Sequence, residues 1–152
     1  MSNAFRFLVV ILSMGLLAAC ASSGPGSTMP ALAGTHWELF AIQSMDDAQG
    51  TTRIGQPGKF TVSFGADGRA SFRLDCNRGT GAWKATPATD GVSGSIEFGP
   101  VEATRALCPP PHLDEKIARD LGYMRGYLFK DGKLYLSLMA DGGIYEWQPL
   151  KP

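Results

Sequence analysis

The sequence has little of the chemistry that metal sites and nucleophilic catalysis require. It contains three cysteines and two histidines, without a Cys-x-x-Cys pair, so a zinc site is not expected. No Gly-x-x-x-x-Gly-Lys-Ser/Thr loop for phosphate occurs. Cys108 and His112 lie four residues apart, but three prolines separate them and no third group is evident to orient the histidine. Asp114 and Glu115 are neighbours on a predicted helix and point apart, which disfavours an acid/base pair. We therefore expect no catalytic residue, no metal and no cofactor.

The chain also lacks an excess of charge of either sign. Fourteen Lys and Arg residues balance fourteen Asp and Glu residues. A nucleic-acid partner is not expected, because neutralising phosphates requires a basic face. No internal repeat of about 20–50 residues occurs, which excludes a solenoid.

Only one long apolar run is present, at the amino terminus. Arg6 precedes 13 residues, 7–19, that carry no charge. As a helix this run rises about 20 Å, less than the ~30 Å hydrocarbon core, which predicts a cleaved signal rather than a permanent span. Residues 17–20, Leu-Ala-Ala-Cys, resemble a bacterial lipobox, whose cysteine becomes the lipidated first residue. We expect a lipoprotein signal peptide at 1–19 and a lipid such as palmitate on Cys20. The alternative is an ordinary signal with an incidental cysteine.

This resemblance also predicts where the protein resides. A processed lipobox cysteine carries three acyl chains, and two or more anchor a protein stably to a membrane. Ala21 follows Cys20, in place of the Asp familiar as an inner-membrane retention residue. We therefore expect attachment to the outer membrane, with the domain in the periplasm. Residues 20–33 are small and nearly uncharged and predict a flexible tether, followed by one domain at 34–150.

Two cysteines remain once Cys20 carries lipid. An oxidising compartment favours a disulfide between Cys76 and Cys108. It would close a loop of about 32 residues, which stabilises by roughly 3–4 kcal/mol in the chain-entropy model. Two buried free thiols or a metal site are the alternatives that the sequence leaves open.

Alternating apolar and polar residues predict strands at 35–42, 60–64, 69–74, 81–85 and 95–98. Between the second and third of these, a three-residue loop at 66–68 brings apolar side chains opposite one another. The expected pairs are Phe64 with Ala70, Val62 with Phe72, and Phe60 with Leu74. This register implies a type I turn with Gly68 in the left-handed region.

Two later turns predict a meander of the last three strands. Two-residue turns at Asp131-Gly132 and Asp141-Gly142 place large apolar side chains on one face. The expected pairs are Phe129 with Leu134, Tyr127 with Leu136, Leu138 with Tyr145, and Leu136 with Trp147. Residues 43–58 and 86–94 are polar and rich in turn formers, and we expect loops there.

One predicted helix interrupts the strands. Its apolar stripe, at spacings of four, four and three, consists of Leu113, Ile117, Leu121 and Met124. Two acidic residues suit its first turn, three prolines precede it, and Gly126 is the expected stop. The stripe is interpreted as core packing. The expected fold is α+β, in which seven or eight antiparallel strands form a curled sheet or small barrel with one helix packed on it.

Two short elements resemble those of a known family. Residues 76–83 read Cys-Asn-Arg-Gly-Thr-Gly-Ala-Trp and are similar to the Cys-Asn-x-x-x-Gly-x-aromatic element of the META (HslJ-like, DUF306) domain. Residues 104–108 read Thr-Arg-Ala-Leu-Cys and resemble its second element, a Thr with a Cys four residues on. Together with the start at Gly34, the resemblance extends to about Gln148. It implies a lipocalin-like barrel, often in an envelope lipoprotein linked to heat shock and other stress responses, with no general catalytic activity.

Four residues carry this resemblance: Asn77, Arg78, Thr104 and Arg105. Their role has two interpretations. In the structural interpretation, Asn77 forms a tight turn and its hydrogen bonds fix the crossing of two segments joined by Cys76 and Cys108. In the functional interpretation, Arg78 and Arg105 project together as an anion or partner site.

The function expected from these observations is that of an envelope lipoprotein with a monomeric, non-catalytic domain. The domain would bind an envelope protein or support envelope integrity under stress. One alternative is a barrel that holds a small apolar ligand, which requires that Trp37, Phe72, Leu136 and Trp147 leave the interior open. Another is an inhibitor that blocks an envelope enzyme through the loop at 43–58.

Overall fold

The computed structural model describes residues 32–151. The expected signal peptide, Cys20 and most of the expected tether lie outside the described residues. The described part contains ten β-strands, one α-helix and one 3-10 turn. They are β1 (His36–Gln43), β2 (Thr51–Arg53), β3 (Phe60–Phe64), β4 (Arg69–Leu74), β5 (Asn77–Pro87), β6 (Ser93–Phe98), β7 (Glu102–Ala103), α1 (Leu113–Leu121), β8 (Met124–Lys130), β9 (Lys133–Leu138), η1 (Met139–Asp141) and β10 (Ile144–Pro149).

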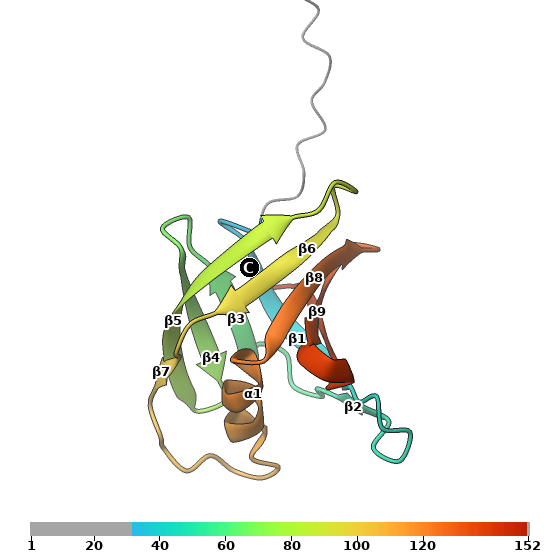
Figure 1. Ribbon diagram of the computed structural model, residues 1–152. Coiled ribbons are helices and arrows are strands. Elements are labelled where there is room, and N and C mark those ends of the chain that lie inside the picture. Colours follow the sequence, from blue (N-terminus) through green and yellow to red (C-terminus); the bar gives the residue numbers. More distant parts are fainter. Residues whose placement is uncertain (1–31, 152) are drawn as a thin grey trace, which may run out of the picture.

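Eight strands close into an antiparallel barrel. Their order is β10-β9-β8-β6-β5-β4-β3-β1, and β1 pairs with β10 to complete the ring (Figure 1). The two short strands lie outside this order, β2 on β1 and β7 on β5. Closure pairs both edges of the barrel strands, which removes most open sheet edges. The barrel alternative is therefore confirmed, whereas the term α+β fits loosely because one nine-residue helix accompanies ten strands.

The barrel interior is packed with large side chains. The four residues that decide whether a ligand fits are all buried: Trp37 is 8% exposed, Phe72 3%, Leu136 0% and Trp147 1%. They belong to one apolar cluster with Phe64, Ile96, Tyr145 and other inward-facing residues. Such packing is typical of a barrel whose interior serves as its core.

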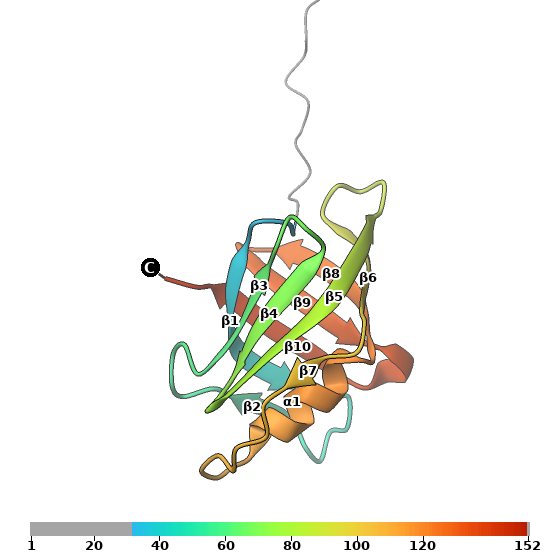
Figure 2. The same ribbon diagram turned by 90° about the vertical axis from the view of Figure 1, so that its left-hand side faces the viewer.

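Helix α1 covers one end of the barrel (Figures 1 and 2). Ile117 and Leu121 have no exposed surface and join the apolar cluster. Leu32, the first described residue, lies at the other end, because Gly34 donates its N–H to the carbonyl oxygen of Phe64 at 2.7 Å. The chain therefore enters the barrel at the end opposite α1. No helix in residues 32–151 is long and apolar enough to span a membrane.

The β3–β4 and β8–β9 hairpins have the predicted registers. Phe64 pairs with Ala70, Val62 with Phe72 and Phe60 with Leu74, and Gly68 has φ 77°. Phe129 pairs with Leu134 and Tyr127 with Leu136 across the turn at residues 131–132. In both hairpins the alternation of apolar residues leaves one register that buries a continuous face.

The register predicted for the last hairpin is wrong by two residues. Tyr145 pairs with Leu136 and Trp147 with Leu134, instead of Leu138 and Leu136. The cause is a longer connection: η1 occupies residues 139–141, and Gly143 accepts the N–H of Leu138 at 3.0 Å. Because side chains alternate with a period of two, a shift of two keeps the same residues inside the barrel.

Four other sequence expectations require correction. Residues 43–58 are not entirely loop, since β2 forms there and pairs with β1. Helix α1 ends at Leu121, so Met124 begins β8 and Gly126 lies within that strand. β5 is longer than 81–85, and β6 starts at Ser93. Asn77 is the first residue of β5 rather than part of the turn, because Asp75, with φ 59°, and Cys76 connect the paired residues Leu74 and Asn77.

The packing of α1 makes a direct prediction about two leucines. Leu121→Ala should lower the free energy of unfolding by about 2–5 kcal/mol, because it leaves a cavity where α1 meets the barrel. Leu107→Ala is the matched control, since Leu107 is 89% exposed, and it should change stability by less than about 0.5 kcal/mol. Urea unfolding followed by circular dichroism measures both. Equal midpoints for the two variants would contradict this role of α1.

Candidate functional site

Two segments that are distant in sequence meet at the α1 end of the barrel. β5 begins there, and β7 pairs with it through Gly79 with Ala103 and Thr80 with Glu102. The two strands approach closely because Gly79 has no side chain: a Cβ there would lie 3.1 Å from a methyl group of Val101. After β7 the chain runs along residues 104–112 to the start of α1. This segment, 104–112, forms a bridge between barrel and helix.

Asn77 binds this bridge from the barrel side. Its side chain is 4% exposed. The amide nitrogen donates to the carbonyl oxygen of Ala106 and to Oδ2 of Asp114, both at 3.0 Å. The amide oxygen accepts hydrogen bonds from Thr104 Oγ1 and from the N–H of Ala106, both at 2.8 Å. We call Asn77, Thr104, Ala106 and Asp114 the Asn77 cluster, because one amide joins β5, the bridge and α1.

The four candidate site residues from the sequence differ in their position relative to the Asn77 cluster and the groove. Asn77 and Thr104 are in the cluster, and Thr104 Oγ1 also accepts the N–H of Arg78 at 3.0 Å. These hydrogen bonds join the start of β5 to the bridge. Arg78 directs a guanidinium N–H to the carbonyl oxygen of Asn77 at 3.1 Å. Arg105 is exposed and lines a groove beside the cluster, a groove that Arg78 does not line.

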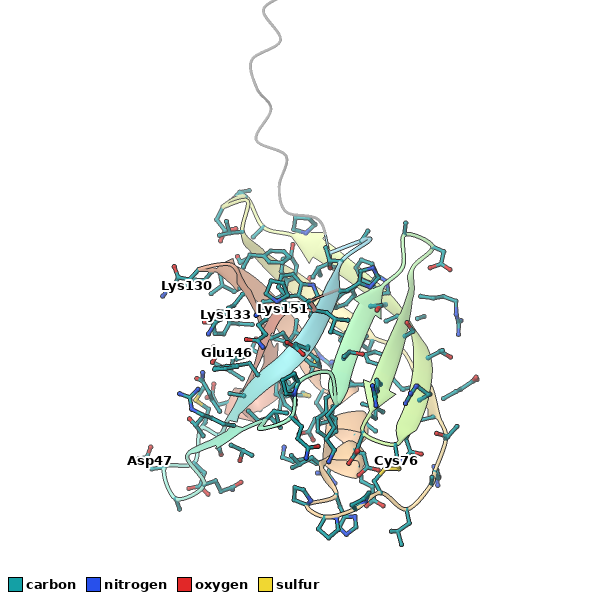
Figure 3. All side chains as sticks on the ribbon, turned by 180° about the vertical axis from the view of Figure 1, so that it is seen from behind. Asp47, Cys76, Lys130, Lys133, Glu146 and Lys151 are labelled. Carbon is teal, nitrogen blue, oxygen red and sulfur yellow. A yellow bond between two sulfur atoms is a disulfide. The ribbon has the colours of Figure 1, made fainter. Side chains whose placement is uncertain are left out.

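A disulfide joins the same two segments. Cys76 and Cys108 are bonded, with their Cα atoms 5.6 Å apart. This is the pairing expected from the cysteine count, and Figure 3 shows Cys76 at the α1 end. Cys108 is 2% exposed and its sulfur lies 3.3 Å from the amide nitrogen of Asn77. Because Cys108 is oxidised, the Cys108/His112 pair has no thiolate to act as a nucleophile.

Helix α1 is positioned by polar contacts as well as by its apolar face. Tyr145 on β10 is fully buried and donates its hydroxyl proton to Oδ2 of Asp120 at 2.6 Å. Lys116 forms an ion pair with the same carboxylate. Burial, followed by the hydrogen bond to Asp120, raises the pKa of Tyr145 well above its ordinary value. The phenol therefore stays protonated and holds α1 against β10.

A groove of about 790 Å³ lies outside the barrel, between α1 and the segment that contains β7 and the start of the bridge. Its charged lining residues are Glu102, Arg105, Asp114, Glu115 and Arg119. Asp114 is 7% exposed, and its Oδ1 atom is buried without a hydrogen-bond partner among the described residues. A buried carboxylate oxygen without a donor is costly, and Asp114 is one of the residues that line the groove. No group of three or more metal-ligating side chains gathers within residues 32–151.

Comparison with known families decides the classification. The META domain model matches residues 30–148. The chain belongs to the META domain family.

One solved structure supports the fold of this META domain. The NMR structure of a protein from Burkholderia xenovorans is similar with a TM-score of 0.58 and 23% identity, over 80% of this chain and 85% of that one. A crystal structure of a DUF4847 family protein from Bacteroides vulgatus has a TM-score of 0.49 and 13% identity, over 80% and 96%. A search of curated proteins gives no match.

Two features of the candidate site were not among the sequence predictions. Asp114 was interpreted only as a first-turn helix residue, whereas its carboxylate is buried against Asn77. Arg119 was not singled out, although it lines the groove opposite Arg105. Asp114 follows Cys108 by six residues, and this spacing is the signal that could have placed Asp114 near Asn77. A disulfide at Cys108 keeps the start of the helix close to Asn77.

The Asn77 cluster makes a prediction about stability. Asn77→Ala should lower the free energy of unfolding by about 2–4 kcal/mol, because the buried carboxylate of Asp114 then keeps no donor. Thr80→Ala is the control on the exposed face of the same strand, where the hydroxyl receives only a 3.3 Å contact from Arg69. Chemical denaturation compares the two. A loss for Asn77→Ala no larger than that for Thr80→Ala would show that the cluster does not hold the bridge.

Proposed function

We propose that this META domain protein is a bacterial envelope lipoprotein that acts by binding a partner in the groove beside the Asn77 cluster. Lipid on Cys20 attaches it to the outer membrane, and the barrel lies in the periplasm. The groove, and not the barrel interior, is the binding site. The domain performs no catalysis in this role, and supports envelope integrity by holding its partner.

The observation that carries this proposal is the contrast between the filled interior of the barrel and the open groove outside it. The interior is occupied by Trp147, Leu136 and their neighbours, which are almost completely buried. The groove is open, has both apolar and charged lining residues, and is bordered by exposed Leu107. Concave surfaces with a few convergent polar groups are the usual binding sites of proteins. A small apolar ligand inside the barrel is therefore not supported by the packing.

The first described residue and the groove lie at opposite ends of the barrel, and this arrangement supports an anchored protein. The described chain begins at Leu32, at one end of the barrel, and the groove lies beside α1 at the other end. Figure 2 shows α1 at the end of the barrel away from the start of β1. A tether that joins Leu32 to a lipid on Cys20 would leave the groove on the side away from the membrane. A partner in the periplasm could then reach it without displacing the anchor.

Metabolic labelling with palmitate tests the anchor. Wild-type protein should incorporate label and fractionate with the outer membrane, whereas Cys20→Ala should do neither, because the thiol is the site of acylation. Ser22→Ala, two residues further on, is the matched control and should label like wild type. Label retained in Cys20→Ala would remove the lipoprotein from the proposal.

Site-specific crosslinking in intact cells tests the groove. A photoreactive amino acid at Leu107, on the groove rim, should give one discrete adduct, whereas the same group at exposed Val92 should not. Adding Arg105→Ala should weaken the adduct, since Arg105 lines the groove, and Arg78→Ala should leave it unchanged. The same adducts from both positions would contradict a binding role for the groove.

A further inference from the structure

The segment that lines the groove has an open backbone edge. β7 pairs with β5 and with no other described strand. The extended chain beyond it continues this pairing, since Thr104 donates its N–H to the carbonyl oxygen of Arg78 at 2.9 Å and Ala106 bonds Asn77. Backbone groups of alternate residues in an extended chain point to opposite sides. Those of Arg105 and Leu107 therefore point away from β5, and they have no hydrogen-bond partner among the described residues.

This open edge is short and bounded. Proline stands at position 100 before β7 and at positions 109–111 after the bridge begins, and proline ends strand pairing because it has no N–H. The six residues 102–107 span about 20 Å at ~3.3 Å per residue. That length suits one extended segment of about five or six residues.

Asp114 lies beside the bridge, next to Asn77. The amide of Asn77 bonds both the carbonyl oxygen of Ala106 and Oδ2 of Asp114 at 3.0 Å, which fixes the carboxylate next to the bridge. Its other oxygen, Oδ1, is buried and has no partner among residues 32–151. A cation is the ligand group that satisfies a buried carboxylate best, because charge-assisted hydrogen bonds are about twice as strong as neutral ones.

The remaining charges of the groove restrict where a cation can bind. Glu102 and Glu115 add negative charge, while Arg105 and Arg119 are exposed and carry positive charge. A cation is attracted toward Asp114 and repelled by the two arginines. A ligand with one basic side chain next to acidic or neutral ones fits this pattern better than a polybasic ligand.

We propose that the groove binds an extended peptide segment of a partner protein by strand addition to residues 102–107. A lysine or arginine side chain of that segment donates to Oδ1 of Asp114. The backbone pairing supplies sequence-independent affinity, and Asp114 selects the basic residue. This inference rests on the proposed function, since it names the chemistry of the partner that the groove holds.

Fluorescence anisotropy with the full chain in detergent tests the inference. The probe is a labelled peptide, acetyl-Thr-Val-Lys-Val-Thr-amide, compared with the same peptide carrying norleucine in place of lysine. Norleucine has nearly the same length without the charge, so it should bind at least about tenfold more weakly. A third peptide, N-methylated on alternate residues along the pairing edge, should bind at least about tenfold more weakly than the unmethylated one, because it cannot complete the backbone pairing.

Asp114→Asn tests the same contact from the protein side. An asparagine can still accept the amide proton of Asn77 and has nearly the same shape, but it lacks the charge. The variant should bind the lysine and norleucine peptides equally, whereas Asp47→Asn, the same change at an exposed residue outside the groove, should keep at least about half of wild-type affinity for the lysine peptide. The comparison of the two peptides on wild-type protein needs no variant, so the inference stays testable if Asp114→Asn does not fold.

The outcomes separate this inference from the proposed function. Equal binding of the lysine and norleucine peptides to wild-type protein would overturn the role of Asp114, and unchanged binding of the methylated peptide would overturn strand addition. No binding of any peptide, together with a discrete crosslink from Leu107, would overturn the peptide inference while leaving the groove as a partner site. No binding and no crosslink would remove both.

Discussion

The side chain of Asn77 is the contact on which the arrangement of the candidate site depends. One buried amide joins the start of β5, the bridge after β7 and the first turn of α1 through four hydrogen bonds of 2.8–3.0 Å. An asparagine side chain suits this position because it carries donors and an acceptor on the same planar group. An aspartate would offer no donor to Asp114, and a leucine would satisfy none of the four partners.

The rest of the fold explains why the amide of Asn77 affects the position of α1. The barrel strands are held by backbone pairing and by an interior packed with aromatic and aliphatic side chains. The helix, in contrast, reaches the barrel through a bridge in which Cys108 is the one buried residue. Hydrogen bonds to Asn77, the disulfide and the contact between Asp120 and Tyr145 therefore act together with the apolar face of α1 to fix where the helix lies beside the groove.

The parts of this structure that the sequence predicts are those in which a local pattern has one low-energy solution. The hairpin around Gly68 is an example, because only one register of Phe60–Phe64 against Arg69–Leu74 buries every apolar residue. The last hairpin was misjudged by two residues, since Asp141-Gly142 resembles a two-residue turn while the chain needs a longer one to bring Trp147 opposite Leu134. β2 has exposed residues only, so no apolar pattern marks it. The groove was not predictable, because it depends on how α1 is oriented against β7.

The division between a packed barrel and a weakly packed bridge has a consequence for dynamics. Segments with little buried apolar surface open locally at lower free energy than the core of the same domain. The bridge is such a segment, and its first residues, 104–107, line the groove. An extended ligand that pairs with the open edge would add the hydrogen bonds that the bridge lacks and restrict its opening. Binding and ordering of the bridge are then coupled, and the partner stabilises the face of the domain that recognises it.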